Sequence, residues 1–572
     1  MQLCDINLPA RDYPSWRQSR LTDRLDESAR LVGLRNNLIS LIVYAIDAGK
    51  ASARLDGTLR SLLQQTYRNI EVLVVGGAIG NVHQAEDFAS YRGLFFEPGL
   101  SHLDILRDLH ADRLWRGDHL MFVVAGTMFD ADTFMMLNAA LNTAPGARVP
   151  DLMLCDHDRV TGAHEFSHPT FSPGWDPDLI QSQDYIETAF VASRGLIQRR
   201  RAQATSCANL HDWLRIVAQE EPHLAARHVT ETLVHLPQAD PAPPPPVVVA
   251  FSPPCAMPDL AVIIPNRNRP DLLAQCLRFM EFQNRFRTEL VIVDNDSDDP
   301  AVPAMYAQLR ERHGAKIVSM NQKFNFARMV NIGVAVSTSP IFLLLNNDVQ
   351  ITSPGLVEQM LAHALRPEVG VVGTKLFNAD GSVQHGGMLL REGHAGVKTM
   401  LALHVLRGAR RGDAGYLNAL SSVRNYQAVT GALMASRREV FVQVGGFDEV
   451  HLPIEFNDVD YCLRVRKAGY RVLCLPLDGI FHFESSTRGT ELSPEVARMR
   501  QAAMVCMAAR WLEQFRHDPY RNPWVELGNV AQARFPWSDG REVYDDPGSA
   551  TPDHASRSED RADIDRNLQC LN

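Results

Sequence analysis

The chain has 572 residues, of which 45% are hydrophobic and 22% are charged, and its formal net charge is -10 at pH 7. This length predicts two to four domains, and the composition is that of a soluble globular protein with sizeable cores. The charge argues against a nucleic-acid partner, because the basic clusters at 199–201 and 407–411 are short and typical of solvated surface.

Neither a leader peptide nor a membrane span is predicted. The amino terminus has no apolar core behind a basic start, and no apolar run approaches the roughly 20 residues that cross a bilayer. The nine cysteines are scattered without paired spacing, which is typical of reduced thiols rather than of a disulfide framework or a zinc site. We therefore expect a cytoplasmic protein without zinc.

A polar, arginine-rich extension covers residues 1–36, and an α/β pattern follows over residues 37–236. Within this first half the motif CDHD, at 155–158, is predicted to lie in a polar loop. The apolar runs predict strands at 38–46, 70–75 and 119–126, with helices at 55–65 and from Asp132 onwards.

Repeated prolines over residues 237–258 predict an extended linker between two domains. A second α/β pattern follows over residues 259–525, and residues 526–572 form a polar tail that is predicted to be disordered. The second pattern opens like the first, with strands predicted at 260–265 and 289–296 and a helix at 271–282.

The two halves read as internal copies, and equivalent places can therefore be compared within one chain. The comparison is uneven, because the ends of the apolar strands carry acids in the second half only. The pairs of equivalent positions are Asp294 against Gly76 and Gly77, and Asn347 and Asp348 against Gly126 and Thr127.

The segment IFLLLNNDV, residues 341–349, is the strongest functional signal. Its apolar run predicts a buried strand, and Asn346, Asn347 and Asp348 follow at the strand's carboxyl end, where ligands bind in open α/β sheets. A cation or a polar substrate would suit these oxygens. A strand that simply runs into an Asn/Asp turn is the structural alternative.

Other candidate positions also have structural explanations. Asp294 can accept hydrogen bonds from a nucleoside or can belong to a turn, and the helix predicted from 325–331 can bind a diphosphate at its start or be an ordinary capped helix. Asp458 and Asp460 begin a predicted helix, where carboxylates complement the helix dipole. His482 alone is more often a satisfied histidine than a ligand.

In combination, these segments resemble family 2 glycosyltransferases with the GT-A fold, of the kind that builds bacterial O-antigen, rhamnan and related surface polysaccharides. The resemblance covers about residues 258–522, and residues 167–186 extend it more weakly to the first half. The segments that carry it, in order, are VIIPNRNRPDLL, VIVDND, NFARMVNIGVA, LLLNNDVQI, VGVVGTKLF, SVQHGG, VTGALMASRREVFVQVGGFDE, FNDVDYCLRVRKAGYRV and HFESSTRG.

The resemblance implies two tandem GT-A domains with Rossmann-like mixed sheets, the first of them degenerate. It implies that Asp348 is a ligand of Mn²⁺ or Mg²⁺, that His482 contacts the diphosphate or the metal, and that Asp458 is the catalytic base. Asn346 replaces the first Asp of the family's metal motif. The residues expected to bind the sugar nucleotide are Pro265, Asn266, Arg267, Asp294, Asn325, Asn331, Asn346 and Asn347.

The implied activity is an inverting, metal-dependent transfer from a nucleoside-diphosphate sugar to a hydroxyl of a glycan or lipid-linked glycan. A lipid-linked acceptor would bring the protein to the inner face of the membrane without a transmembrane segment. A non-catalytic carbohydrate-binding or scaffold protein is one alternative. A nucleotidyltransferase is another, but its Gly-rich phosphate loop is not found in IIPNRNRP.

The first half is expected to serve acceptor binding, packing or assembly, because Asn209 and His211 stand where an active relative would carry acids. Asp156 and Asp158 could instead serve a diverged site in this half.

Overall fold

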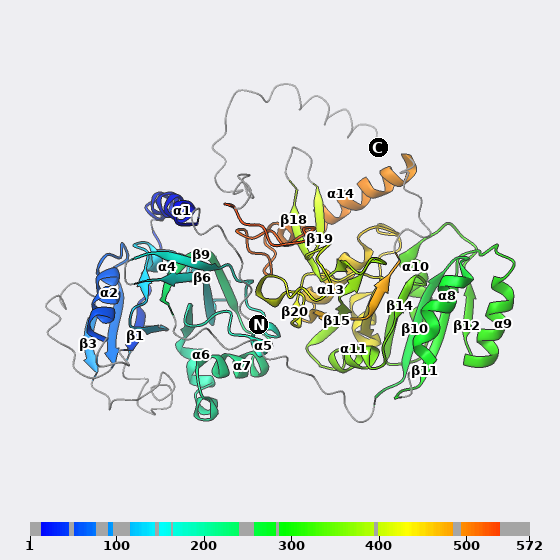
Figure 1. Ribbon diagram of the computed structural model, residues 1–572, viewed down its shortest axis with the longest axis horizontal. Coiled ribbons are helices and arrows are strands. Elements are labelled where there is room, and N and C mark those ends of the chain that lie inside the picture. Colours follow the sequence, from blue (N-terminus) through cyan, green and yellow to red (C-terminus); the bar gives the residue numbers. More distant parts are fainter. Residues whose placement is uncertain are drawn as a thin grey trace, which may run out of the picture.

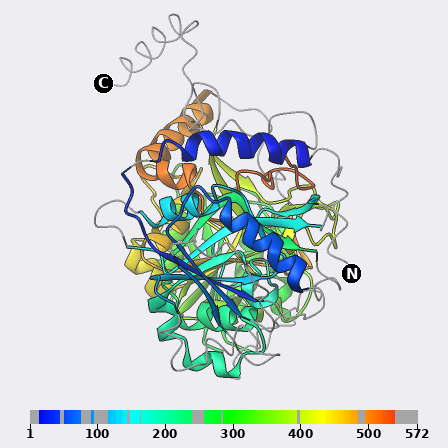
Figure 2. The same cartoon turned by 90° about the vertical axis from the view of Figure 1, so that its left-hand side faces the viewer.

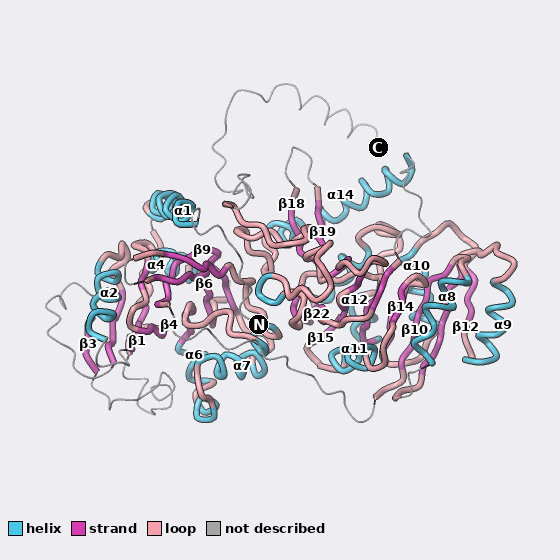
Figure 3. The backbone as a smooth tube through the Cα atoms, viewed as in Figure 1, coloured by secondary structure: helices cyan, strands magenta, loops and turns pink. Residues whose placement is uncertain are grey.

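The computed structural model describes residues 13–31, 33–44, 51–75, 90–94, 115–142, 148–161, 164–238, 257–281, 285–393, 399–483 and 494–537. Two α/β halves lie side by side, with the first half on the left of Figure 1 and the second on the right. Figure 3 shows helices packed against the strands of both halves. Among the described residues, no helix combines the length and hydropathy that a membrane crossing requires.

The first half is built on a nine-stranded sheet in the order β3-β2-β1-β4-β8-β6-β9-β5, with β7 paired to β6. Its strands are β1 (Ile39–Tyr44), β2 (Ile70–Val75), β3 (Ser90–Leu94), β4 (His119–Val124), β5 (Met128–Phe129), β6 (Leu152–Val160), β7 (Phe166–Thr170), β8 (Phe190–Ser193) and β9 (Ala226–Pro237). Its helices are α1 (Tyr13–Ser28), α2 (Ala51–Leu63), α4 (Thr133–Leu141), α5 (Leu179–Ser182), α6 (Arg194–Arg199), η3 (Ala202–Ser206) and α7 (Leu210–Glu220).

The second half is built on an eight-stranded sheet in the order β12-β11-β10-β13-β21-β15-β22-β20. The strands of this sheet are β10 (Leu260–Asn266), β11 (Thr288–Asp294), β12 (Lys316–Ser319), β13 (Ile341–Leu345), β15 (Val369–Thr374), β20 (Arg424–Asn425), β21 (Leu433–Arg437) and β22 (Arg471–Leu475). A smaller sheet in the order β14-β23-β16-β17 and a hairpin complete the strands: β14 (Val349–Ile351), β16 (Leu376–Phe377), β17 (Val383–His385), β23 (Ile480–His482), β18 (Met388–Glu392) and β19 (Met400–His404).

The second half also contains helices, some of which pack on its main sheet. They are α8 (Pro270–Cys276), η4 (Leu277–Glu281), α9 (Val302–His313), α10 (Phe326–Val336), α11 (Leu356–Ala364), η5 (Tyr416–Asn418), α12 (Arg438–Val444), α13 (Asn457–Lys467) and α14 (Pro494–Arg516). The central strands β10 and β13 are buried along their whole length. This burial explains why their sequences are continuous apolar runs rather than alternating ones.

The two sheets share one topology. The order β3-β2-β1-β4-β8-β6-β9 matches β12-β11-β10-β13-β21-β15-β22 strand for strand. The pairings agree as well, because β8 and β21 are each antiparallel to both neighbours while the other pairs in these series are parallel. The fold class predicted from the sequence, two tandem Rossmann-like mixed-sheet units, is confirmed. The strand end with Gly76 and Gly77 lies outside the described residues.

The prediction that CDHD forms a polar loop is wrong. Residues 155–158 lie within β6, and Asp156 and Asp158 are fully buried. Each carboxylate is stabilised by hydrogen bonds from other elements: Asn522 donates to Asp156 at 2.7 Å, and Tyr13 donates to Asp158 at 2.7 Å. Partners far apart in sequence therefore make this polar stretch compatible with a buried strand.

Both ends of the described chain pack onto the fold, which the sequence did not predict. Helix α1 lies across the first half in Figure 2, and its Tyr13 is buried. The predicted tail begins too early at 526, because Phe535 and Trp537 are also buried. Trp537 packs on Tyr13 and Phe171, and one hydrophobic core therefore contains residues of both halves. Residues 538–572 lie outside the described residues.

Buried carboxylates of the first half also connect it to the second half. Asp178 accepts hydrogen bonds from Arg366 at 2.6 Å and from Asn425 at 2.8 Å, and Asn425 also donates to Asp176 at 2.7 Å. Burial alone would raise the pKa of Asp178, but Arg366 and Arg471 lower it. The carboxylate is therefore held ionised by cations of the other half.

We expect Asp178→Ala to lower the free energy of unfolding by about 3 to 5 kcal/mol, because it removes the buried carboxylate that Arg366 and Arg471 share at this interface. Urea unfolding followed by tryptophan fluorescence measures this loss. Asp56→Ala is the matched control, because it removes only the exposed pair with Arg60 and should cost no more than about 1 kcal/mol. Equal losses in the two variants would contradict this account of the interface.

Candidate active site

Three strand ends of the second half meet through a chain of hydrogen bonds. Asn347, just after β13, donates to Asn266 at the end of β10 at 2.7 Å. Asn266 donates to Tyr306 on α9 at 2.8 Å, and Tyr306 donates to Asp294 at the end of β11 at 2.6 Å. The chain brings Asn266, Asp294 and Asn347 together at the carboxyl edge of the sheet, where open α/β folds bind ligands.

Asp348 and His482 face each other beside this edge. Strand β14 pairs with β23 in a register that places Val349 opposite His482, and the backbone of Phe483 donates to the carbonyl of Asp348 at 3.0 Å. The Nε2 atom of His482 lies 3.2 Å from Oδ1 of Asp348. Two residues far apart in the sequence thus share one site. The segment that follows Phe483, from residue 484, lies outside the described residues.

The oxygens at this site suit a divalent cation. Within the described residues, Oδ1 of Asp348 and Oδ1 of Asn346 are both buried and have no hydrogen-bond partner. Buried acceptors without a donor are costly, and a hard cation that binds oxygen and imidazole nitrogen would satisfy them. The described residues contain no cluster of three or more His, Cys, Asp or Glu side chains that could hold a metal alone.

Asp458 is the second residue of α13 and lies close to the Asn346 segment. Its Oδ2 accepts a hydrogen bond from the backbone of Gly431 at 2.8 Å, and the next residue, Ala432, accepts one from the backbone of Asn346 at 2.9 Å. Its Oδ1 accepts from the backbone of Val459 at 2.8 Å. Burial raises the pKa of Asp458 above its usual value, although these backbone donors act against it. A carboxylate with a raised pKa suits a general base.

Asp460 has a different role from Asp458. It is fully buried and accepts hydrogen bonds from Arg464 at 2.7 Å and from the indole of Trp511 at 2.8 Å. Asp460 therefore fastens α14 to α13, and only Asp458 of the two acids is available to a substrate.

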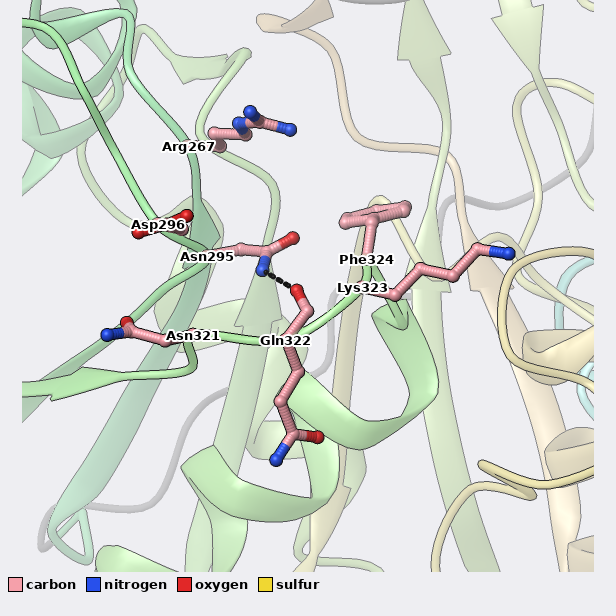
Figure 4. Close-up of a pocket in the computed structure, with 7 residues that line it drawn as sticks. All are labelled: Arg267, Asn295, Asp296, Asn321, Gln322, Lys323 and Phe324. Atoms are coloured by element: carbon pink, nitrogen blue, oxygen red, sulfur yellow. Dashed lines mark hydrogen bonds between the residues drawn. The ribbon is translucent and has the colours of Figure 1, made fainter.

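A polar pocket of about 580 Å³ adjoins Asp294. Its lining residues, drawn in Figure 4, are Arg267, Asn295, Asp296, Asn321, Gln322, Lys323 and Phe324. The amide of Asn295 donates to the carbonyls of Met320 and Gln322 at 3.0 and 2.8 Å. Its Oδ1 is buried and has no hydrogen-bond partner in the described part of the chain.

The remaining predicted nucleotide-binding residues differ in position. Pro265 lies in β10 opposite Val293 of β11, and Arg267, the exposed residue after β10, lines the pocket. Asn325 caps α10 and donates to the carbonyl of Glu449 at 2.8 Å, while Asn331 exchanges two hydrogen bonds of 2.9 Å with the backbone of Phe447. Both asparagine amides thus hold the segment after α12 against α10 and are already engaged within the protein.

Sequence reasoning missed two residues that organise the site. Tyr306 lies within an amphipathic helix, and nothing in the pattern marks it; burial and its hydrogen bond to Asp294 raise its pKa, which keeps the hydroxyl protonated as a donor. Gln384 stands in the segment SVQHGG, which carried the family resemblance, and it contacts His482.

The equivalent place in the first half is filled by protein. Met128 pairs with His235 as Val349 pairs with His482, so that His235 is the counterpart of His482 and buried Thr127 is that of Asp348. The guanidinium of Arg17, from α1, lies 2.8 Å from Nε2 of His235. Arg17 also pairs with Asp130, and α1 therefore closes this end of the first sheet.

The position equivalent to Asp458 is also occupied by a different residue. His211 is the second residue of α7, as Asp458 is of α13, and its Nε2 lies 2.7 Å from the carbonyl of Ile180. Asn209 caps the same helix by accepting from the backbone of Asp212 at 2.9 Å. Asp156 and Asp158 are engaged in the interior, and neither acid forms an open site.

Residues 261–440 match the family model of glycosyl transferase family 2. The chain therefore contains a family 2 glycosyltransferase domain, and the resemblance inferred from the sequence is confirmed.

Similarity to individual proteins extends over both halves. The uncharacterized protein y4gI of Sinorhizobium fredii is 26% identical over 90% of this chain, and the O-antigen biosynthesis protein RfbC of Myxococcus xanthus is 27% identical over 90%. The chain spans 60% of the first relative and 42% of the second. An N-acetylglucosaminyl-diphospho-decaprenol L-rhamnosyltransferase of Mycobacterium tuberculosis is 28% identical over 33% of this chain and 61% of its own length.

Proposed function

We propose that the second half transfers a sugar, with inversion, from a nucleoside-diphosphate sugar to a hydroxyl of a glycan acceptor in surface polysaccharide synthesis. The observation that carries this proposal is the pair of facing acceptors, Oδ1 of Asp348 and Nε2 of His482, 3.2 Å apart at the edge that also holds Asp294. The family match and the name of the O-antigen relative support the reaction class and the pathway.

The residues divide into three tasks. The pocket beside Asp294 has the volume of a small-molecule site and would take the nucleoside, with Asn295 and Arg267 among its polar groups. Asp348 and His482, with Asn346, would hold Mn²⁺ or Mg²⁺. Such a cation neutralises the charge that develops on a departing diphosphate.

Asp458 would accept the proton of the attacking hydroxyl. Its two oxygens are oriented by the amides of Gly431 and Val459, and its raised pKa increases its basicity as a proton acceptor. A single displacement needs one base and no enzyme nucleophile on the anomeric carbon, and it inverts the configuration. A retained anomeric configuration in the product would contradict this assignment.

The first half, in this proposal, is a degenerate copy that binds no donor. Thr127 and His211 stand where the active half has Asp348 and Asp458, and Arg17 contacts His235, the counterpart of His482. Its extensive contacts with the second half favour a role in packing and in shaping the acceptor side. A lipid-linked glycan is the acceptor that would bring the chain to a membrane surface.

The test is a panel of nucleoside-diphosphate sugars, mixed with the purified chain and a lipid-linked or soluble glycan, with and without Mn²⁺. We expect release of nucleoside diphosphate that depends on acceptor and on Mn²⁺. Binding without release would favour the carbohydrate-binding alternative, and release of pyrophosphate would indicate a nucleotidyltransferase.

A further inference from the structure

The orientation of the Gln384 side chain is determined by its surroundings. Gln384 belongs to β17 and is buried, and its Nε2 lies 3.1 Å from the backbone carbonyl of His482 and 3.0 Å from Oδ1 of Asn378. A backbone carbonyl can only accept a hydrogen bond. The amide nitrogen must therefore point toward His482 O, and Oε1 of Gln384 must be the acceptor on the other side.

This orientation selects one tautomer of His482. Its Nδ1 lies 2.7 Å from Oε1 of Gln384, and because that oxygen only accepts, Nδ1 carries the proton. In a neutral imidazole with a proton on Nδ1, Nε2 presents a lone pair. That lone pair is 3.2 Å from Oδ1 of Asp348, an oxygen that lacks any hydrogen-bond partner among the described residues. Nε2 of His482 and Oδ1 of Asp348 are thus two neighbouring hydrogen-bond acceptors, with no donor from the described segments between them.

We propose that Gln384 is a positioning residue that holds His482 with its proton on Nδ1, so that Nε2 and Asp348 Oδ1 together face a divalent cation. The proposal deepens the proposed function and rests on it for the nature of the group between the two acceptors. Ligating histidines are commonly held in this way, with the second ring nitrogen donating to a fixed oxygen, and the orientation of the ring and its basicity follow.

The first half offers an independent comparison. His235, the counterpart of His482, has Nδ1 2.6 Å from a carboxylate oxygen of Asp158, and its Nε2 lies 2.8 Å from the Arg17 guanidinium and 3.0 Å from a carboxylate oxygen of Asp130. In both halves an oxygen therefore faces Nδ1 of the histidine: Asp158 on the neighbouring strand β6 supplies it in the first half, and Gln384 on β17 supplies it in the second.

The variant Gln384→Met tests the proposal, because methionine keeps the length of the side chain but removes the acceptor for Nδ1. Titration of Mn²⁺ into the full chain, followed by electron paramagnetic resonance of the free ion, is expected to show binding weakened about 10- to 100-fold. Gln384→Glu retains an oxygen acceptor for Nδ1 but loses the amide that donates to the carbonyl of His482, and it should therefore bind Mn²⁺ more tightly than Gln384→Met does. Gln219→Met, at an exposed glutamine of the first half, is the matched control and should change nothing.

A second measurement reports the tautomer itself. In the chain labelled with ¹⁵N-histidine, His482 should show a protonated Nδ1 and an unprotonated Nε2, and Gln384→Met should shift it toward a mixture of tautomers. A folded Gln384→Met variant that binds Mn²⁺ normally, while Asp348→Ala does not, overturns the role of Gln384 and leaves the proposed function standing. An unaltered chain that binds no Mn²⁺ overturns the cation site, and this role of Gln384 with it.

Discussion

Replacing Asp458 by asparagine is expected to lower kcat about 10²- to 10⁴-fold. The amide keeps the shape of the side chain but cannot take the proton from the attacking hydroxyl of the glycan. Asp458 belongs neither to the pocket beside Asp294 nor to the Asp348 pair, and donor affinity should therefore be nearly unchanged. Steady-state kinetics combined with calorimetric titration of the donor separates the two quantities.

The pH dependence of the reaction also tests the role of Asp458 as the base. Burial raises the pKa of Asp458, and the carboxylate is a base only when it is deprotonated. The rate should therefore fall as the pH falls through this raised pKa, above the value of about 3.9 of an unperturbed aspartate. Asp458→Asn should abolish this acidic limb.

The neighbouring acid provides the control for Asp458. Asp460→Asn alters a carboxylate two residues along the same helix, but one that is bound to Arg464 and Trp511. This variant should lose thermal stability and retain kcat. Near-normal turnover by Asp458→Asn would remove Asp458 as the base.

Replacing Asp348 by alanine is expected to abolish Mn²⁺-dependent donor binding. The loss should exceed the roughly 10- to 100-fold that removal of an outer-shell partner costs, because Asp348 is placed as a ligand itself. Donor titration at increasing Mn²⁺ concentrations measures it. Asp271→Ala is the matched control, since this acid is exposed and pairs with Arg269 nearby. An unchanged Mn²⁺ titration in Asp348→Ala would refute the ligand role.

The sequence predicted those parts of the fold that local patterns determine. The run at 70–75 became β2 with identical bounds, and the run before Asn346 became β13, because strands buried on both faces are continuous apolar segments. The helix predicted near 458 became α13. Helix boundaries shifted by a few residues, as when the helix predicted at 55–65 became α2 at Ala51–Leu63.

Long-range partners account for what the sequence missed. The sequence predicted a loop for the β6 segment with Asp156 and Asp158, because the partners of these acids, Tyr13 and Asn522, come from the two ends of the chain. The packing of Trp537 against Phe171 likewise has no local signal.

In the candidate site, too, local patterns could be predicted from the sequence and long-range contacts could not. Asp348 was visible because it ends an apolar strand, whereas its closeness to His482 depends on the pairing of β14 with β23. The chain from Asn347 through Asn266 and Tyr306 to Asp294 depends on side-chain orientation, which no periodicity encodes.

The central claim is that the chain has one donor site, in the second half, built around Asp348. Calorimetric titration of the full chain with the nucleoside-diphosphate sugar that supports transfer, in the presence of Mn²⁺, tests this most directly. We predict one binding site per chain and no binding to Asp348→Ala. Two sites per chain, or one site that persists in Asp348→Ala, would contradict the account.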